Sequence, residues 1–404
     1  MTVIEFFDKE SAIENIASAL LCSPERIVFI GSDVQLMDKR TRGYKSILAA
    51  RGINVEFLFR PVTRNRLNAV TDVLESIISE SEECCIDLSG GDELYLVAAG
   101  AVYQKYREKT TLRRFNFNCN SVINCDTDGN VIEKSPVMLN VDENVIVYGG
   151  RVIYNDEKTI ATQRWILNRD FKSDIKTMWE VCKKDRASWN AMTNILARLC
   201  RCCFIGQSLT LSVRGDDARE AEKIPSGILY TLEERGIIHN FKTGRGLSFA
   251  FKNEQVMKCL TKAGQLLELF IAVTAAELNE GEEPVYNSIG NGVYIDWDGK
   301  TNSYSRVEVE NEIDVILMKG MIPVFVSCKN GAVDTDELYK LSVVAERFGG
   351  KYVRKALVAS QLDSMGYRAE YIRARAADMN IDIIEDGDLL NNEKLCEKLR
   401  NLWK

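Results

Sequence analysis

Residues 306–331 read RVEVENEIDVILMKGMIPVFVSCKNG, and this stretch predicts the β-hairpin around which the rest of the chain is organised. Lys319 and Gly320 separate two runs rich in β-branched and apolar residues, and glycine tolerates the positive φ that a two-residue turn requires. A turn centred on this pair sets the expected register: Asp314 opposite Phe325, Glu312 opposite Ser327 and Glu310 opposite Lys329.

Side chains of a strand alternate between two faces, so this hairpin should have one polar and one apolar face. The polar face is expected to carry Glu308, Glu310, Glu312, Asp314, Ser327 and Lys329, and the apolar face Val307, Val309, Ile313, Val315 and Leu317. Carboxylates crowded on one face repel one another unless a divalent cation or solvent offsets their charge. A lysine among them can position water beside a metal-bound phosphate. The alternative is a solvated sheet edge with scattered acids.

The hairpin resembles the PD-(D/E)XK nuclease superfamily. Asp314 matches the motif aspartate, and Ser327-Cys328-Lys329 occupies the (D/E)-X-K position, with a serine where an acid is usual. The superfamily also brings an acid from a preceding helix, and the apolar segment 262–278 is a predicted helix that contains Glu268. The resemblance implies catalytic roles for Glu308, Asp314 and Lys329. It implies a site for Mn²⁺ or Mg²⁺ formed by Glu308, Asp314, Cys328 and Glu268. Glu308, Glu310 or Glu312 can substitute for the acid that is missing at Ser327.

Composition limits the classes of protein that fit. With 404 residues the chain can form two or three domains, and its net charge of -7 argues against a general positive field that coats nucleic acid. The 12 cysteines have no disulfide-framework spacing, and we see no secretory signal or long apolar span, so a cytoplasmic protein is expected. The cluster Cys200-Arg201-Cys202-Cys203 favours buried thiols over a metal site, and a lone His239 argues against histidine catalysis.

The first 150 residues alternate predicted strands and helices, which is typical of a doubly wound, mostly parallel α/β sheet. The expected strands are 26–31, 53–59, 84–88 and 113–117, and the expected helices are 41–51, 64–79 and 92–106. Ligands of such sheets bind at the carboxyl ends of the strands.

Small and polar residues follow three of these strands, where backbone N–H groups and a helix N-terminus can approach a phosphate. The candidate ligand-binding residues are Gly31, Ser32, Asp33, Thr63, Arg64, Ser89, Gly90, Gly91, Asp92 and Glu93. Neither GxGxxG nor GxxxxGK[ST] is present, which weakens a dinucleotide or nucleoside triphosphate site. The structural alternative is that these glycines serve turns and helix caps.

The segment Asp87-Leu88-Ser89-Gly90-Gly91-Asp92 resembles a CARF domain, the Rossmann-like sensor of cyclic oligoadenylates in type III CRISPR immunity. Its position ahead of a PD-(D/E)XK-like domain makes the combination specific. The resemblance implies a homodimer whose paired sensors bind cyclic tetra-adenylate as an allosteric activator.

The middle of the chain loses the β/α alternation. A predicted helix at 224–236 and two strands at 237–242 and 247–252, around a turn containing Arg245, outline a winged-helix-like module. Nearby acidic residues offset its positive charge. A module that connects the domains or supports a dimer is therefore favoured over one that binds DNA. Beyond the hairpin we expect helix 334–349, strand 352–359, helix 367–380 and strand 381–385. Cations that either contact phosphate or lie solvated on the surface are Lys340, Arg347, Lys351, Arg354 and Lys355.

The combined prediction has three parts: a sensor at 1–150, a connector at 151–254 and a nuclease at 255–404. It describes an activator-dependent, metal-dependent endonuclease that cleaves DNA or RNA in antiviral defence. The competing hypothesis is a ligand-responsive nucleic-acid-binding regulator with an inactive nuclease domain, in which Ser327 marks the lost activity.

Overall fold

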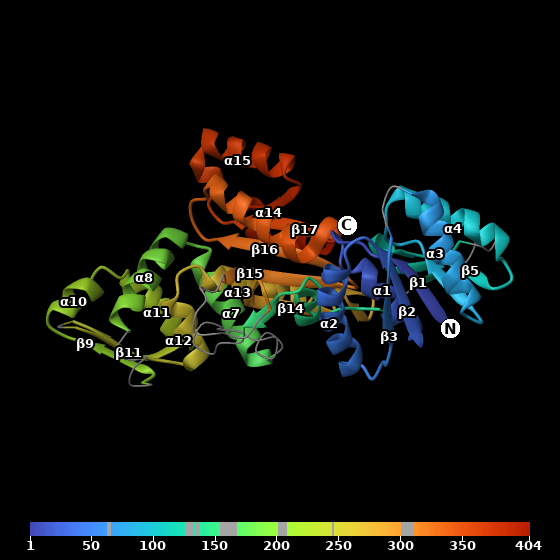
Figure 1. The fold of residues 1–404 in the computed structure, drawn as a ribbon. Helices are drawn as coiled ribbons and strands as arrows, with labels where there is room; N and C mark the ends of the chain where they lie inside the picture. Colours follow the sequence, from blue (N-terminus) through green and yellow to red (C-terminus); the bar gives the residue numbers. More distant parts are fainter. Residues whose placement is uncertain are drawn as a thin grey trace.

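The computed structural model describes residues 1–62, 66–125, 132–134, 137–153, 168–200, 208–244, 246–299 and 310–404. Three parts follow one another in space (Figure 1): a seven-stranded sheet at one end, a six-stranded sheet in the centre and a small helical and β module at the other end. Candidates that lie outside the described residues are Thr63, Arg64, Cys202, Cys203, Arg245 and Glu308.

The seven-stranded sheet has the order β3-β2-β1-β4-β5-β6-β7. The first five strands are parallel and the last two are antiparallel, which confirms the predicted mostly parallel sheet. Its elements are β1 (Thr2–Phe6), α1 (Glu14–Cys22), β2 (Arg26–Gly31), α2 (Val34–Ala50), β3 (Glu56–Pro61), α3 (Leu67–Ser79), β4 (Cys84–Asp87), α4 (Glu93–Lys105), β5 (Thr110–Asn116), the 3₁₀ turn η1 (Phe117–Cys119), β6 (Ser121–Asn124) and β7 (Ile132–Lys134).

Sequence reasoning missed β1, although it lies between β2 and β4 in the sheet and all five of its residues are buried. Its sequence TVIEF carries a β-branched signal that could have revealed it. Successive residues of the strands point to opposite faces of the sheet and belong to two different hydrophobic clusters. Ile27 and Phe29 pack with α1 and α2, and Val28 and Ile30 pack with α3 and α4. Helices therefore cover both faces, as a doubly wound fold requires.

The six-stranded sheet has the order β18-β17-β16-β15-β14-β8, in which β14, β15 and β16 are antiparallel and β16, β17 and β18 are parallel. Residues of α13 pack on one face and residues of α14 on the other. Its elements and neighbours are α5 (Val141–Val147), β8 (Arg151–Ile153), α13 (Gln265–Ala276), β12 (Asn279–Glu280), β13 (Glu283–Pro284), β14 (Ser288–Asp296), β15 (Glu310–Lys319), β16 (Ile322–Lys329), α14 (Thr335–Gly349), η2 (Gly350–Tyr352), β17 (Arg354–Ala359), η3 (Asp363–Met365), α15 (Tyr367–Asp378), β18 (Ile381–Ile384), α16 (Asp386–Leu389) and α17 (Asn392–Asn401).

The hairpin exists, but its predicted register is wrong by two residues. Val315 pairs with Val326 and Lys319 pairs with Ile322, so the turn is Gly320-Met321, with Gly320 at φ 61°. Gly320 thus takes the first central position of the turn instead of the second. Its N–H donates to Asn287 at 2.7 Å, and its carbonyl accepts from the Leu139 N–H at 2.9 Å. These contacts with residues far away in the sequence favour the turn at Gly320-Met321.

The predicted polar face is interrupted as well. Ile313 packs in one core cluster with Ile316, whereas Val315 packs in the other. Across the ladder, Gly292 of β14 has a φ of 57°, which lies outside the extended range of a regular strand. The simple alternation therefore fails around Asp314.

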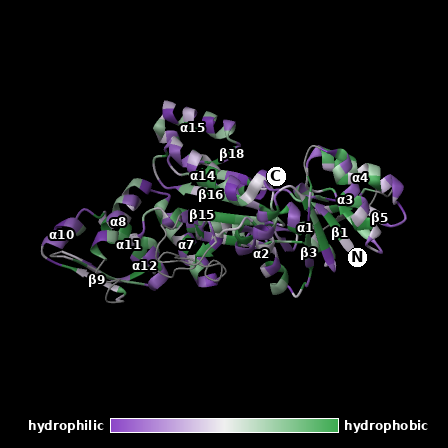
Figure 2. Cartoon of the chain, viewed as in Figure 1, coloured by the Kyte–Doolittle hydropathy of each residue, from purple (hydrophilic) through white to green (hydrophobic). Residues whose placement is uncertain are grey.

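The end module contains the predicted helix and wing, and Thr210–Val213 adds a third strand in the order β10-β11-β9. Its elements are α7 (Arg169–Cys182), α8 (Arg186–Leu199), β9 (Thr210–Val213), α10 (Asp216–Ala221), α11 (Ser226–Glu234), β10 (Ile238–Thr243), β11 (Leu247–Phe251) and α12 (Glu254–Thr261). Strands of both large sheets are mainly hydrophobic, and the outlying helices α10 and α15 carry hydrophilic residues (Figure 2). No helix in the described ranges is both long and apolar enough to cross a membrane.

Candidate functional site

Asp314 lies where the ladder between β15 and β16 stops. Continuing the register by one pair places it opposite Ser327, whose hydroxyl donates to the Asp314 Oδ2 at 3.2 Å. The Cys328 backbone N–H donates to the same oxygen at 2.6 Å. Burial raises the pKa of Asp314, and the Cys328 hydrogen bond and the charge of Lys329 partly offset that effect. Ser327 therefore helps to orient the Asp314 carboxylate.

Glu268 comes from α13 and is 7% exposed. Burial, followed by the negative charge of Asp314, raises the pKa of Glu268 to about 8, whereas Lys262 lowers it. Gln265 donates to the Glu268 Oε2 at 3.2 Å and to the Asn291 Oδ1 at 3.3 Å. Asn291 in turn donates to the Asp314 backbone carbonyl at 3.0 Å. This amide chain ties α13 to β15.

Sequence reasoning missed Gln265 and Asn291. Each is a polar residue in an otherwise apolar element, and that contrast is the signal that could have identified them.

Lys329 ends β16 and forms an ion pair with Glu337 of α14 at 2.9 Å. Burial would lower the pKa of Lys329, but the Glu337 hydrogen bond and the charge of Asp314 outweigh it, so the pKa is raised. Asp314, Ser327, Lys329 and Glu337 share a cavity of about 110 Å³. The cavity brings together the predicted aspartate and lysine from neighbouring strands.

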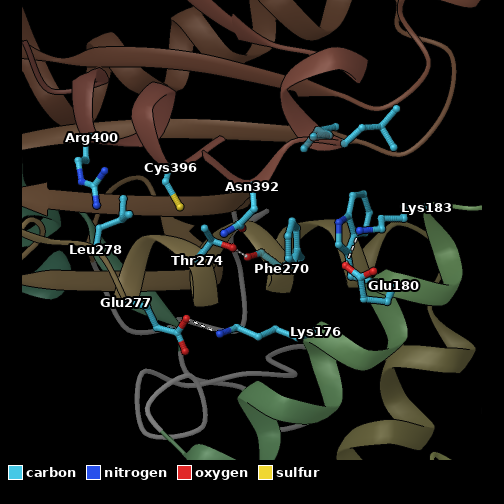
Figure 3. Close-up of a pocket in the computed structure, with 13 residues that line it drawn as sticks. Lys176, Glu180, Lys183, Phe270, Thr274, Glu277, Leu278, Asn392, Cys396 and Arg400 are labelled. Carbon is cyan, nitrogen blue, oxygen red and sulfur yellow. Dashed lines mark hydrogen bonds and ion pairs between the residues drawn. The ribbon is translucent and has the colours of Figure 1, made fainter. Parts of the chain in front are cut away.

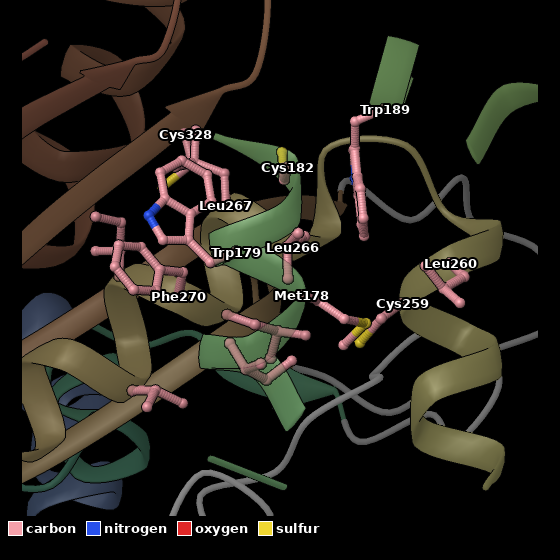
Figure 4. Packing of buried hydrophobic residues seen from close by; sticks show 14 of the residues in the cluster. Met178, Trp179, Cys182, Trp189, Cys259, Leu260, Leu266, Leu267, Phe270 and Cys328 are labelled. Carbon is pink, nitrogen blue, oxygen red and sulfur yellow. The ribbon is translucent and has the colours of Figure 1, made fainter. Parts of the chain in front are cut away.

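The remaining predicted ligands lie in different surroundings. Glu312 lines the same cavity, and Lys262 holds its Oε1 at 3.0 Å. The Cys328 side chain lies in the hydrophobic cluster with Trp179 and Leu267 (Figure 4). Burial raises the pKa of this thiol well above its usual value. The thiol is therefore poorly placed for a cation beside Asp314, and the Cys328 backbone carbonyl is the better candidate.

The donor set suits a hard divalent cation. Carboxylate and carbonyl oxygens are the ligands that Mg²⁺ prefers, and a cation between Glu268 and Asp314 would favour the ionised form of both. Among the residues that the structure describes, no group of three or more His, Cys, Asp or Glu side chains is arranged to hold a metal ion. The predicted ligand Glu308 falls outside those residues.

The segment Ser89–Gly91 packs tightly against the end of β1. The Ser89 hydroxyl accepts from the Phe115 N–H at 2.7 Å. A Cβ at Gly90 would lie 2.9 Å from the Phe6 carbonyl oxygen, and one at Gly91, where φ is 91°, would lie 2.5 Å from the Phe6 Cβ. The packing against Phe6 therefore leaves no space for a side chain at either glycine.

The other candidate ligand residues lie at the same edge. Asp33 and Asp92 are the N-caps of α2 and α4 and accept from the Leu36 and Tyr95 N–H groups, at 2.9 and 3.3 Å. Ser32 and Glu93 are exposed, whereas Gly31 is buried against Phe7. Both aspartates therefore serve as helix caps. Because they are acidic, a phosphate bound at this edge would need positive charge from another part of the chain.

A separate cavity of about 380 Å³ lies beside α7, α13 and α17 (Figure 3). Trp179 and Phe270 stack in its wall with ring centroids 4.6 Å apart. Lys176 pairs with Glu277, and Lys183 pairs with Glu180. Carboxylates of the same wall therefore hold both lysines, and Arg400 is a further cation that lines the cavity.

The chain matches no protein-family model and no curated protein sequence. It is similar to protein VC1899 from Vibrio cholerae, with 18% identity and a TM-score of 0.76, over 99% of both chains. It is also similar to Can2 from Sulfobacillus thermosulfidooxidans, whose structure was solved in complex with cyclic tetra-adenylate. That match has 12% identity and a TM-score of 0.65, over 99% of this chain and 97% of Can2. The two matches establish one fold over nearly the whole chain.

Proposed function

We propose that the protein is an endonuclease that hydrolyses phosphodiester bonds with Mn²⁺ or Mg²⁺ and is activated by cyclic tetra-adenylate in type III CRISPR antiviral defence. The observation that carries the proposal is that Asp314 and Lys329 share one cavity, while Gln265 and Asn291 link the buried Glu268 of α13 to the Asp314 backbone. Buried carboxylates beside a lysine are costly for stability, and such clusters mark functional sites.

Each residue has a distinct role in this proposal. Glu268, Asp314 and the Cys328 carbonyl would hold the metal, and Glu308 would be a further ligand. A bound divalent cation would polarise the phosphate and favour ionisation of water. Ser327 and the Cys328 N–H keep the Asp314 carboxylate oriented. Lys329 positions the attacking water and offsets the charge that builds on the phosphate oxygens.

The ligand half of the proposal is supported by the shared fold with Can2, which was solved with cyclic tetra-adenylate. In this proposal residues 1–150 form a CARF-type sensor, 151–254 a connector and 255–404 a PD-(D/E)XK-type nuclease. Two copies of the chain pair their sensors around one two-fold symmetric ligand, so that binding changes the dimer geometry. Nucleic acid, as DNA or RNA, is the substrate.

The competing function is a ligand-responsive regulator that binds nucleic acid without cleaving it. Ser327 in place of the usual acid and the winged-helix-like arrangement of α11, β10 and β11 favour it. In that case ligand would change nucleic-acid affinity and the backbone of the nucleic acid would stay intact.

The deciding experiment incubates the full-length protein with Mn²⁺ and labelled DNA and RNA, with and without cyclic tetra-adenylate. We expect cleavage only with both additions, loss of cleavage in EDTA, and loss of most turnover in Asp314→Asn. Asparagine keeps an oxygen that can accept from the Cys328 N–H, so the variant should fold. Ligand-dependent binding without cleavage would establish the regulator instead.

A further inference from the structure

An ion pair joins the seven-stranded sheet to the six-stranded sheet beside the Ser89–Gly91 loop. Glu14, the first residue of α1, has a fully buried side chain, and its Oε1 lies 2.6 Å from the Lys351 Nζ. The Tyr352 hydroxyl donates to the same Oε1 at 2.6 Å. Lys351 also lies 3.9 Å from the Asp8 Oδ2 and is 48% exposed. One cation of the nuclease part is thus held by two carboxylates of the sensor part.

The second oxygen of Glu14 faces the loop. A Cβ at Gly90 would lie 3.5 Å from the Glu14 Oε2 and 3.4 Å from the Asp8 Cβ. This buried oxygen accepts no hydrogen bond from any residue that the structure describes. The loop therefore packs directly on the buried Glu14 carboxylate, and the half-exposed Lys351 is the member of the ion pair that a ligand at this edge could contact.

The charge around the loop calls for a cation. Asp87, Asp92 and Glu93 belong to the loop and its flanks, and Asp8 and Glu14 lie beside it. A phosphate would be repelled by this set unless a positive group offset it. Lys351 is a cation held beside this set by Glu14 and Asp8, the two acids that contact Gly90.

A second set of contacts connects the loop to the same segment. Ser89 accepts from Phe115, the Phe115 ring lies 4.6 Å from the Phe117 ring, and the Phe117 ring lies 4.6 Å from the Tyr352 ring. Lys351 and Tyr352 directly follow α14, whose first turns carry Glu337, the partner of Lys329. A shift of Lys351 would reach the candidate active site through one helix.

We propose that Lys351 is a ligand-binding residue of the sensor pocket, supplied by the nuclease part, and that it exchanges Glu14 for a phosphate of the bound ligand. The inference rests on the proposed function, because the ligand is a cyclic oligoadenylate. In the free protein Glu14 and Asp8 hold the ammonium group. In the complex the phosphate takes it, and the exchange moves the segment between α14 and β17.

The test measures the affinity of full-length protein for cyclic tetra-adenylate by calorimetry, without any cleavage step. Lys351→Met should weaken binding by about tenfold, as expected for a lost charged hydrogen bond. Glu14→Gln should tighten binding by about fivefold, because it removes the competitor for Lys351. Lys351→Arg should retain binding. Lys105→Met is the matched control, since Lys105 pairs with Glu75 at 3.0 Å at the far end of α4.

The opposite signs separate this proposal from a structural role. An ion pair that only holds the two parts together predicts that Lys351→Met and Glu14→Gln weaken binding alike, and that outcome overturns the proposal. Normal binding by Lys351→Met overturns it as well and leaves the proposed function standing. If the unmodified protein binds no cyclic oligoadenylate, the proposed function fails, and this inference fails with it.

Discussion

At the scale of single residues, the candidate active site is characterised by hydrogen bonds and ion pairs between charged side chains. Asp314 accepts two hydrogen bonds from β16, and Lys329 is drawn between Asp314 and Glu337. Glu337 holds the ammonium group in the absence of substrate. A phosphate that enters the cavity would add a second anion beside the same ammonium group. Lys329 is therefore expected to act mainly on the transition state.

Lys329→Ala should lower the cleavage rate by roughly 10²-fold or more, the loss typical of a catalytic electrostatic group. Affinity for nucleic acid should change little, which separate rate and binding measurements would establish. Lys319→Ala is a suitable control, because Lys319 forms a comparable ion pair with Glu280 at 3.2 Å at the other end of the hairpin. Cleavage by Lys329→Ala at the normal rate would contradict the assigned role.

At the scale of elements, the loop before α4 depends on its glycines for packing. Gly91 has a positive φ and no space for a side chain beside Phe6. Gly100 lies inside α4, exposed, with no atom within 4 Å of an added Cβ. The fold therefore needs the glycine just before α4, Gly91, but only tolerates the glycine inside the helix, Gly100.

Gly91→Ala should lower the free energy of unfolding by more than about 2 kcal/mol, because strain at positive φ adds to overlap with Phe6. Gly100→Ala should raise it by about 0.5–1 kcal/mol, because alanine favours the helix. Urea unfolding of both variants measures the difference. Equal effects would mean that the loop does not pack on β1 as described.

At the scale of the whole molecule, the two large sheets share a continuous hydrophobic core. The cluster runs from Phe29 in β2 through Tyr148 to Phe325 in β16 and Phe348 in α14. Asn144 of α5 donates to the Phe348 carbonyl at 2.8 Å, deep in that core. This packing makes the seven-stranded and six-stranded sheets neighbours in one structure, and the Glu14–Lys351 ion pair also joins them.

Gly350→Ala should disrupt this docking. A Cβ there would lie 2.7 Å from the Tyr148 hydroxyl and 2.9 Å from the Glu10 carbonyl oxygen. Gly366 has the same φ of 59° but open space around it, so Gly366→Ala carries the backbone strain alone, about 1–3 kcal/mol. Gly350→Ala should cost roughly a further 1–3 kcal/mol in denaturant unfolding. Identical losses in the two variants would argue against close docking at Gly350.

The sequence by itself determined the local features: the alternation of strands and helices, the hairpin, and the residue types of the acid and lysine pair. These follow from side-chain period and turn chemistry, which act over a few residues. The tertiary structure decided the rest. Gly320 can occupy either central position of a two-residue turn, and only its contacts with Asn287 and Leu139 select one. Likewise, nothing near Glu14 in the chain indicates Lys351, because an ion pair between residues 337 positions apart exists only after the two sheets have packed together.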